Sequence, residues 1–373
     1  MPATTTNREL SLLAPLGFAA LLIAFGGAAV LADAWEWRWL LQSASAWLCI
    51  WLLAWRRRAS NVSARDSAPH PVLGWANRLT LLRGWLIAAT AGFLLQPPFD
   101  TAASAWLPAI CYTLAAILDR LDGFVARRGD RVSEFGSALD TTFDALGLLV
   151  APLLALQYGK IHGSYLLVSV AYYLFQAGLG YRRRRGLPTF PLVPNTLRRT
   201  LAGFQMGFIA VVLWPLFSAP LSLVIGWAFM IPLLTGFVVD WFVVSGRIRP
   251  ERATSMKFFA TIERLGTTLL QPLLRLLLLP ALYLASLNNG TALFTSALGL
   301  GLLASAIFTV AGLAARAAAL VLLLLLAGFF PDRPLDAVVG TLIFCVVWIM
   351  LLGSGRFSLW QGDEVWIKRY DGA

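Results

Sequence analysis

Long apolar runs separated by short polar connections make up most of this chain. The first two, at residues 11–32 and 37–55, are each close to the roughly 20 apolar residues that a helix needs to cross a bilayer. Residues 33–36 form a short polar turn between them. The second run ends at three consecutive arginines (residues 56–58), a cluster that marks the cytoplasmic side of a span. The pattern therefore predicts a transmembrane hairpin.

The same pattern predicts six further spans after a polar, proline-containing segment at residues 59–74. Their approximate positions are residues 75–95, 104–118, 136–157, 164–180, 200–217 and 221–244. The connections alternate in charge: arginines gather on one side, whereas Lys160 is the only Lys or Arg in the connections on the other side. By the positive-inside rule the arginine-rich side is cytoplasmic, so both ends of this six-span unit face the cytoplasm.

Four more apolar runs follow a polar joint at residues 247–257 and bring the expected total to about twelve spans. They lie at residues 258–287, 291–313, 317–330 and 337–352. The fold class that we predict is all-α, a polytopic integral membrane protein. Its expected parts are a transmembrane hairpin (1–58), a cytoplasmic linker (59–74), a six-helix core (75–249), and a C-terminal transmembrane bundle with a tail (250–373).

Composition agrees with this prediction and removes other classes of protein. Of the 373 residues, 58% are hydrophobic and 13% are charged, whereas soluble domains have about 45–50% apolar and about 25% charged residues. The 30 Lys and Arg exceed the 19 Asp and Glu, for a net charge of +11. Most of this excess lies in the predicted cytoplasmic connections, so we expect no nucleic-acid partner. The three cysteines lie inside apolar runs and have no metal-site or disulfide spacing.

Four aspartates interrupt the apolar pattern around one predicted cytoplasmic turn. Asp119 and Asp122 are three residues apart, and Asp140 and Asp144 are four apart, so each pair shares one face of a helix. One pair ends a span and the other begins the next, so a helical hairpin brings them together. Carboxylates at close range need cations, and oxygen ligands suit Mg²⁺ or Mn²⁺. Two such ions can clamp a phosphoryl group during its transfer.

The residues around these aspartates favour a phosphate-containing substrate. Gly123 and Gly136 leave room for a ligand close to the backbone. Arg127 follows Asp122 by little more than one helical turn, and arginine binds phosphate through two parallel hydrogen bonds. Metal ions, phosphate and a cytoplasmic membrane surface together indicate a nucleotide-activated lipid substrate.

The complete spacing resembles the signature of the CDP-alcohol phosphotransferase family at every fixed position. In this sequence it reads Asp119-x2-Asp122-Gly123-x2-Ala126-Arg127-x8-Gly136-x3-Asp140-x3-Asp144. The resemblance covers about residues 71–249, and the stretch at residues 77–83 is similar to the family's entry to its first core helix. It implies a membrane-bound transferase of phospholipid biosynthesis. It also implies a homodimer, since members of the family are commonly dimeric.

Carried over position by position, the resemblance implies a site for two Mg²⁺ or Mn²⁺ ions. The implied metal ligands are Asp119, Asp122, Asp140 and Asp144, and Asp144 is also the implied catalytic base. The implied CDP-binding residues are Gly123, Ala126, Arg127 and Gly136, with Ser133 and Thr80 as further contacts to the nucleotide.

The expected donor is CDP-diacylglycerol, because Asp140 lacks the neighbouring histidine that marks users of CDP-choline or CDP-ethanolamine. For the acceptor, Arg198 and Arg199 open the next span, and Arg199-Thr200-x4-Gln205 resembles the Lys-Thr…Gln stretch of bacterial phosphatidylglycerophosphate synthases, with Arg in place of Lys. These cations favour a phosphorylated polyol, either glycerol 3-phosphate or inositol phosphate. Serine or another alcohol remains open as the acceptor.

Two other interpretations remain open. The carboxylates can belong to a cation transporter, although transport sites usually lie near the bilayer midplane, or to an inactive family member that serves as a scaffold. The C-terminal block weakly resembles DoxX-like membrane proteins at residues 312–320 and 353–360. An accessory bundle that packs on the catalytic unit is the simpler interpretation of that block.

Overall fold

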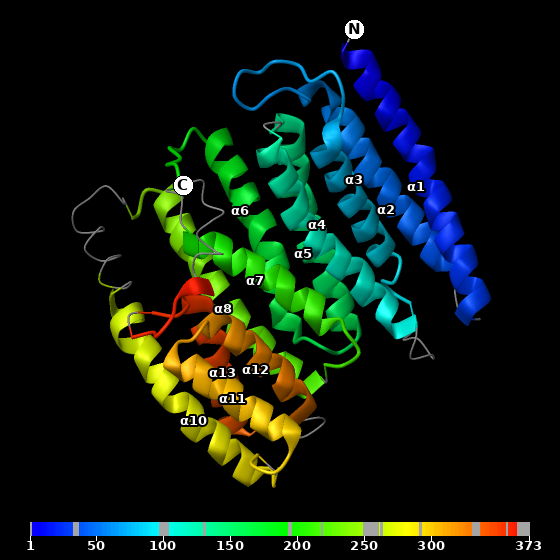
Figure 1. Ribbon diagram of the computed structural model, residues 1–373. Helices are drawn as coiled ribbons and strands as arrows, with labels where there is room; N and C mark the ends of the chain where they lie inside the picture. Colours follow the sequence, from blue (N-terminus) through cyan, green and yellow to red (C-terminus); the bar gives the residue numbers. More distant parts are fainter. Residues whose placement is uncertain are drawn as a thin grey trace. The chain divides into compact units, whose positions relative to one another are not determined.

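The fold is helical throughout the part of the chain that the computed structural model describes (Figure 1). That part comprises residues 2–32, 37–96, 104–129, 132–192, 196–217, 219–248, 261, 264–290, 293–329, 336–355 and 357–363. Its twelve α-helices are α1 (Pro2–Ala32), α2 (Trp37–Arg57), α3 (Gly74–Ala91), α4 (Leu107–Arg128), α5 (Glu134–Gln157), α6 (Leu166–Arg184), α7 (Thr196–Val212), α8 (Ala219–Val244), α10 (Gln271–Asn288), α11 (Ala297–Ala311), α12 (Ala315–Phe329) and α13 (Ala337–Leu352). Isolated bridges are the only β pairing within those ranges. The predicted all-α class is therefore confirmed.

Each predicted apolar run contains a helix, but the helices differ in how clearly they qualify as spans. Among the described residues, four helices are long and apolar enough to cross a membrane: Thr5–Gly27, Glu134–Gln157, Ala219–Val244 and Thr268–Asn288. Four shorter apolar helices are Thr200–Val212, Ala297–Ala311, Ala315–Phe329 and Ala337–Leu352. These observations agree with a polytopic membrane protein, and the total of about twelve spans stays a prediction.

Side-chain caps determine where several helices begin. Ser133 starts α5 and Ser296 starts α11, each from an extended backbone with its hydroxyl accepting an N–H of the first turn. Asp336 caps α13 in the same way, with the Val339 N–H 2.7 Å from its carboxylate. Such caps satisfy amide groups that have no partner inside the helix. The sequence signal for these helix starts is therefore local.

The chain forms two compact units. The first comprises Met1–Gly159 and Met206–Pro215, and the second comprises Lys160–Gln205 and Leu216–Ala373. These boundaries follow packing, whereas the predicted four-part division follows the spans and the motif. That division stays a prediction.

In the first unit α3 is the central helix, because it packs against α2, α4 and α5. Helix α1 packs against α2 and is fastened by indole N–H groups. Trp51, Trp47 and Trp85 donate to the main-chain carbonyls of Leu10 (2.8 Å), Ala14 (3.1 Å) and Gly17 (3.0 Å). Since a hydrogen bond away from water has no competing partner, these contacts fix α1 beside its neighbours.

The segment between α2 and α3, predicted as a linker, is folded back on itself. Val62 pairs with Pro69, and the Ser63 N–H donates to the Ala68 carbonyl at 2.8 Å. Hydrogen bonds from Ser63 and the Ala68 N–H hold the pKa of Asp66, in the turn of this small hairpin, below its ordinary value. The segment therefore has defined structure.

In the second unit α10, α11, α12 and α13 form a helical bundle, with α13 also packed against α8. The buried Arg275 of α10 donates to the carbonyls of Ser354 and Phe357, which follow α13. The guanidinium thus provides a hydrogen-bond partner for carbonyls in the irregular segment that follows the helix.

Gly84 provides a test of the packing around α3. A Cβ at this position would lie 2.9 Å from Cε2 of Phe143 and 3.0 Å from Cγ2 of Ile50. We expect Gly84→Ala to lower the free energy of unfolding by about 1–3 kcal/mol, the usual cost of overpacking. Denaturant unfolding in detergent measures it.

Gly26 of α1 is the matched control, because a Cβ there meets nothing within 4 Å. Gly26→Ala should stabilise α1 by up to about 1 kcal/mol, the helix propensity gain of alanine over glycine. Equal stability of the two variants would contradict the close packing of α3.

Candidate active site

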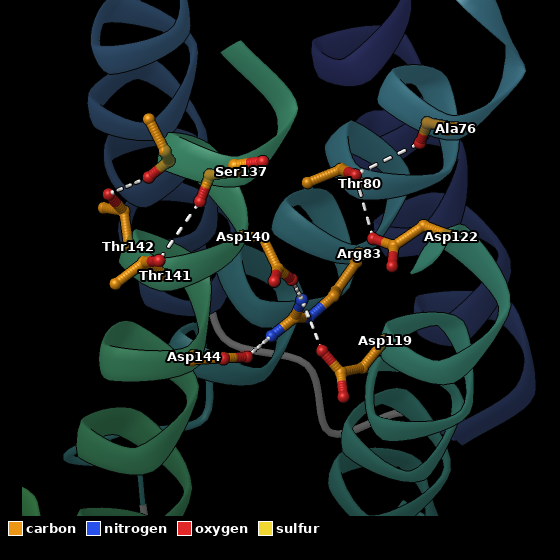
Figure 2. A network of polar contacts seen from close by, with 11 residues as sticks. Ala76, Thr80, Arg83, Asp119, Asp122, Ser137, Asp140, Thr141, Thr142 and Asp144 are labelled. Atoms are coloured by element: carbon orange, nitrogen blue, oxygen red, sulfur yellow. Dashed lines mark hydrogen bonds and ion pairs between the residues drawn. The ribbon is translucent and has the colours of Figure 1, made fainter. Parts of the chain in front are cut away.

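The structure brings three of the four predicted carboxylates together. Asp119 lies on α4, and Asp140 and Asp144 lie on α5, with the two helices facing each other at this point (Figure 2). One carboxylate oxygen from each of the three lies within 4.8 Å of the others. The hairpin predicted from the sequence therefore assembles an acidic group from both helices.

A cation that the sequence reasoning did not single out lies among these carboxylates. The side chain of Arg83 on α3 is completely buried, with 0% of its surface exposed. Its Nη1 lies 2.8 Å from Oδ1 of Asp119 and 2.7 Å from Oδ1 of Asp140, and its Nη2 pairs with Oδ1 of Asp144 (Figure 2). The planar guanidinium suits this task because it presents several donors in a fixed fork.

The sequence did contain a signal for Arg83, namely a charged residue inside the predicted span at residues 75–95. Charges at membrane depth are rare and usually have partners or a function. The sequence could not show the partner, because the contact joins residues that are 36 and more positions apart in the chain, Arg83 and Asp119 being the nearest pair.

Asp122, the fourth carboxylate, has a different partner. It is buried, and its Oδ2 lies 2.8 Å from the Thr80 hydroxyl, which is also 3.1 Å from the Ala76 carbonyl. Thr80 was expected to contact the nucleotide, and its hydroxyl contacts Asp122 in this structure. The nucleotide contact stays a prediction.

Ser133 and Gly136 occupy the first turn of α5. The Gly136 N–H donates to the Ser133 hydroxyl at 3.0 Å. A Cβ on Gly136 would collide with Oδ1 of Asn77, so glycine is required for α3 and α5 to approach each other here. Close packing thus accounts for Gly136, while contacts of both residues with CDP stay predictions.

The residues after Asp122 lie on the last turns of α4. Arg127 is exposed. Its guanidinium lies beside Gly123 of the same helix: a Cβ on Gly123 would be 3.2 Å from Nη1 of Arg127. Ala126 is partly exposed. Their contact with CDP stays a prediction.

The predicted acceptor residues lie on α7. The side chains of Arg198 and Arg199 are outside the described residues, so their role stays a prediction. Gln205 on the same helix is fully buried, accepts from the Tyr165 hydroxyl and donates to the Phe229 carbonyl at 2.6 Å. Gln205 therefore has a structural role inside the second unit.

The carboxylate group fits a divalent metal ion in both geometry and donor type. Arg83 engages only Oδ1 of Asp119, Asp140 and Asp144, which leaves the second oxygen of each for another ligand. The side chains of Asp140 and Asp144 are 46% and 42% exposed, so an ion can reach them. Carboxylate oxygens are the donors that Mg²⁺ and Mn²⁺ prefer.

Comparison with known proteins supplies the family. Residues 73–236 match the family model of the CDP-alcohol phosphatidyltransferases. Over these residues the chain is similar to the CDP-alcohol phosphatidyltransferase family. All four aspartates and Arg83 lie within the CDP-alcohol phosphatidyltransferase segment, and α1, α2 and α10 to α13 lie outside it.

The match confirms the resemblance seen in the motif and supports an enzyme that transfers phospholipid head groups from CDP-alcohols in the membrane. Members of the CDP-alcohol phosphatidyltransferase family are generally dependent on divalent metal ions, which agrees with the carboxylate group. Searches among curated proteins and among solved structures gave no match. The likeness of the C-terminal block to DoxX-like proteins stays a prediction.

Replacing Arg83 by methionine tests the charge balance of the site. In the absence of divalent ions we expect a loss of about 3–5 kcal/mol in unfolding free energy, because the carboxylates then face one another without a cation. Saturating Mn²⁺ should recover part of this loss. Unfolding of Arg83→Met with EDTA and with Mn²⁺ measures both effects.

Arg78 of the same helix is the matched control, since it is exposed and pairs with Glu9 at 3.0 Å. Arg78→Met should cost less than about 1 kcal/mol, with the same value in EDTA and Mn²⁺. If the loss for Arg83→Met were also independent of the ions, the guanidinium and the metal site would not be coupled.

Proposed function

We propose that this protein transfers the phosphatidyl group of CDP-diacylglycerol to the hydroxyl of a small alcohol and releases CMP. One observation carries the proposal: within the segment that matches the family, Asp119 of α4 and Asp140 and Asp144 of α5 converge between the two helices. Asp122 lies one turn from Asp119 and completes the proposed set of metal ligands.

Asp144 is the proposed general base. Its Oδ1 pairs with Arg83, so Oδ2 is the oxygen that would accept the proton. The acceptor oxygen attacks the phosphorus nearer the diacylglycerol, a new P–O bond forms, and the P–O bond to CMP breaks with its electron pair leaving on CMP. Divalent ions held by the carboxylates would stabilise the negative charge on the phosphates.

The N-terminal turns of α5 and the last turns of α4 form the proposed CDP site. Gly123, Ala126 and Arg127 of α4 would lie along one side of the nucleotide, and Ser133 and Gly136 along the other. A guanidinium suits the pyrophosphate, because it forms two parallel hydrogen bonds to phosphate oxygens. The arginine-rich connections favour a cytoplasmic orientation for this site.

CDP-diacylglycerol is the proposed donor and a phosphorylated polyol is the proposed acceptor. Thr141, Thr142 and Phe143 follow Asp140, without the histidine of CDP-choline and CDP-ethanolamine users. Arg198 and Arg199, at the start of α7, would bind the phosphate of glycerol 3-phosphate or inositol phosphate.

A cation transporter accounts less well for the same residues. Arg83 pairs with three of the carboxylates, and a fixed positive charge on a cation path opposes transport. The glycines and Arg127 of the motif also have no role in that interpretation, whereas phosphate binding uses them.

Asp144→Asn tests the proposed base. Amide nitrogen cannot accept the proton, so we expect CMP release to fall by about 10²–10⁴-fold, the usual contribution of general base catalysis. Binding of CDP should persist, because Asp144 is not among the proposed nucleotide contacts. Purified protein with CDP-diacylglycerol and Mg²⁺ gives the rate, and calorimetry gives the affinity for CDP.

Thr141→Ala is the control, since Thr141 is an exposed neighbour on α5, and it should keep full activity. Normal turnover by Asp144→Asn would remove the role assigned to this aspartate.

A panel of acceptors tests the proposed substrate. We expect CMP release with glycerol 3-phosphate or inositol phosphate and little release with serine. Arg199→Gln should raise the KM for the phosphorylated acceptor by about tenfold, the equivalent of one charge-assisted hydrogen bond. CMP release with serine alone would show that serine, and not a phosphorylated polyol, is the acceptor. No CMP release with any acceptor would favour the transporter or scaffold interpretation.

A further inference from the structure

The segment that precedes the family match is hydrogen-bonded to the helix that carries Asp140 and Asp144. We call residues 57–72 the brace. Ser63 of the brace pairs with Ser133, the cap of α5. The Ala64 N–H donates to the Val132 carbonyl, and the Glu134 N–H donates to the Val62 carbonyl, both at 3.0 Å. The brace thus holds the backbone on both sides of Ser133.

Asn61 connects the brace to two helices and is almost fully buried, at 5% exposure. Its Nδ2 donates to the Thr6 hydroxyl of α1 at 3.2 Å and to the Val72 carbonyl at 3.1 Å. Its Oδ1 accepts from Nδ2 of Asn77 on α3 at 3.2 Å. Both ends of the amide are therefore used, which suits a buried polar group.

The connection continues from Asn77 to the start of α5. The Ser133 hydroxyl donates to Oδ1 of Asn77 at 3.2 Å and accepts from the Gly136 N–H at 3.0 Å. Asn77 and Ser133 are 5% and 3% exposed. A continuous buried network thus runs from Asn61 to Gly136, and buried networks with every member paired are rigid.

A second contact reaches α5 one turn further along. Arg57, at the end of α2, donates from Nη1 to the Ala138 carbonyl at 2.7 Å and lies 3.3 Å from the Thr142 hydroxyl. Ala138 and Thr142 flank Asp140 in the sequence. The brace therefore contacts α5 before its first turn and again beside a proposed metal ligand.

We propose that Asn61 and Arg57 are positioning residues that fix the first three turns of α5 against α3. Through these two residues the end of α2 and the brace set the distance between the Ser133–Gly136 turn of α5 and helix α3, which carries Thr80 and Arg83. This inference rests on the proposed function for its consequence, because displacements of about 1 Å in an active site can cost about 100-fold in rate. The structural part of the inference is independent of any reaction.

Two matched pairs of variants test the proposal. Asn61→Ala removes the link to Asn77, whereas Thr6→Ala removes only the outer bond to Asn61 and leaves the rest of the network. Arg57→Gln removes the contact with Ala138, whereas Arg56→Gln makes the same change of charge at an exposed neighbour. Arg57 is itself exposed, so its variant should fold even if Asn61→Ala does not.

The first measurement is amide hydrogen exchange in detergent, which needs no substrate. Asn61→Ala should speed exchange across residues 133–139, and Arg57→Gln should speed it across residues 138–144. Thr6→Ala and Arg56→Gln should leave both segments at the wild-type rate. Unchanged exchange in both Asn61→Ala and Arg57→Gln would overturn the proposal.

The second measurement separates positioning from general stability. Asn61→Ala should raise the KM for CDP-diacylglycerol by about tenfold with a smaller effect on kcat, since it acts on the nucleotide side of α5. Combined with Ser133→Ala, its effect should be much smaller than the product of the two single effects, because both act through one network. Independent effects would overturn the proposal.

The two measurements also distinguish a failure of the positioning role of the brace from a failure of the proposed transferase function. If the wild-type protein released no CMP with any acceptor, the proposed function would fail, and hydrogen exchange would still decide the role of the brace. If CMP release were normal and exchange in α5 did not respond, only the brace would fail.

Discussion

The proposed site depends on one buried guanidinium surrounded by carboxylates. Arg83 alone would be very costly to bury, and Asp119, Asp140 and Asp144 alone would repel one another at separations below 4.8 Å. Each therefore requires the other. Because Arg83 belongs to α3, Asp119 to α4 and the other two to α5, this interaction also fixes the mutual positions of the three helices that form the site.

The network around Asn61 and Asn77 has a complementary effect at the N-terminal turns of α3 and α5. Arg83 fixes the carboxylate side of α5, and the Asn77–Ser133 contact fixes its first turn. Close packing at Gly136 requires the same register. Helix α5 is thus attached to α3 at several levels, which is the arrangement that a site with demanding geometry needs.

The parts of this structure that could be predicted from the sequence depend on local patterns. Long apolar runs predicted every α-helix in the described ranges, and the spacing of the aspartates predicted that Asp119 and Asp140 would meet across a hairpin. The partner of Arg83 could not be predicted, because nothing local indicates which distant carboxylates neutralise it. The brace was predicted as a linker for a similar reason. A polar residue such as Asn61 looks the same in the sequence whether its partner in the folded protein is water or a buried amide.

Formal charge explains why an arginine is useful at the base of this site. Four aspartates and Arg83 together carry three negative charges, fewer than the carboxylates alone, so the helices can assemble before any metal ion binds. The remaining negative charge still attracts divalent cations. With two such ions the same residues would carry a single positive charge, which would attract the pyrophosphate of the proposed donor. An arginine in place of a neutral residue thus lowers the repulsion among the aspartates during folding and still leaves negative charge for the proposed divalent ions.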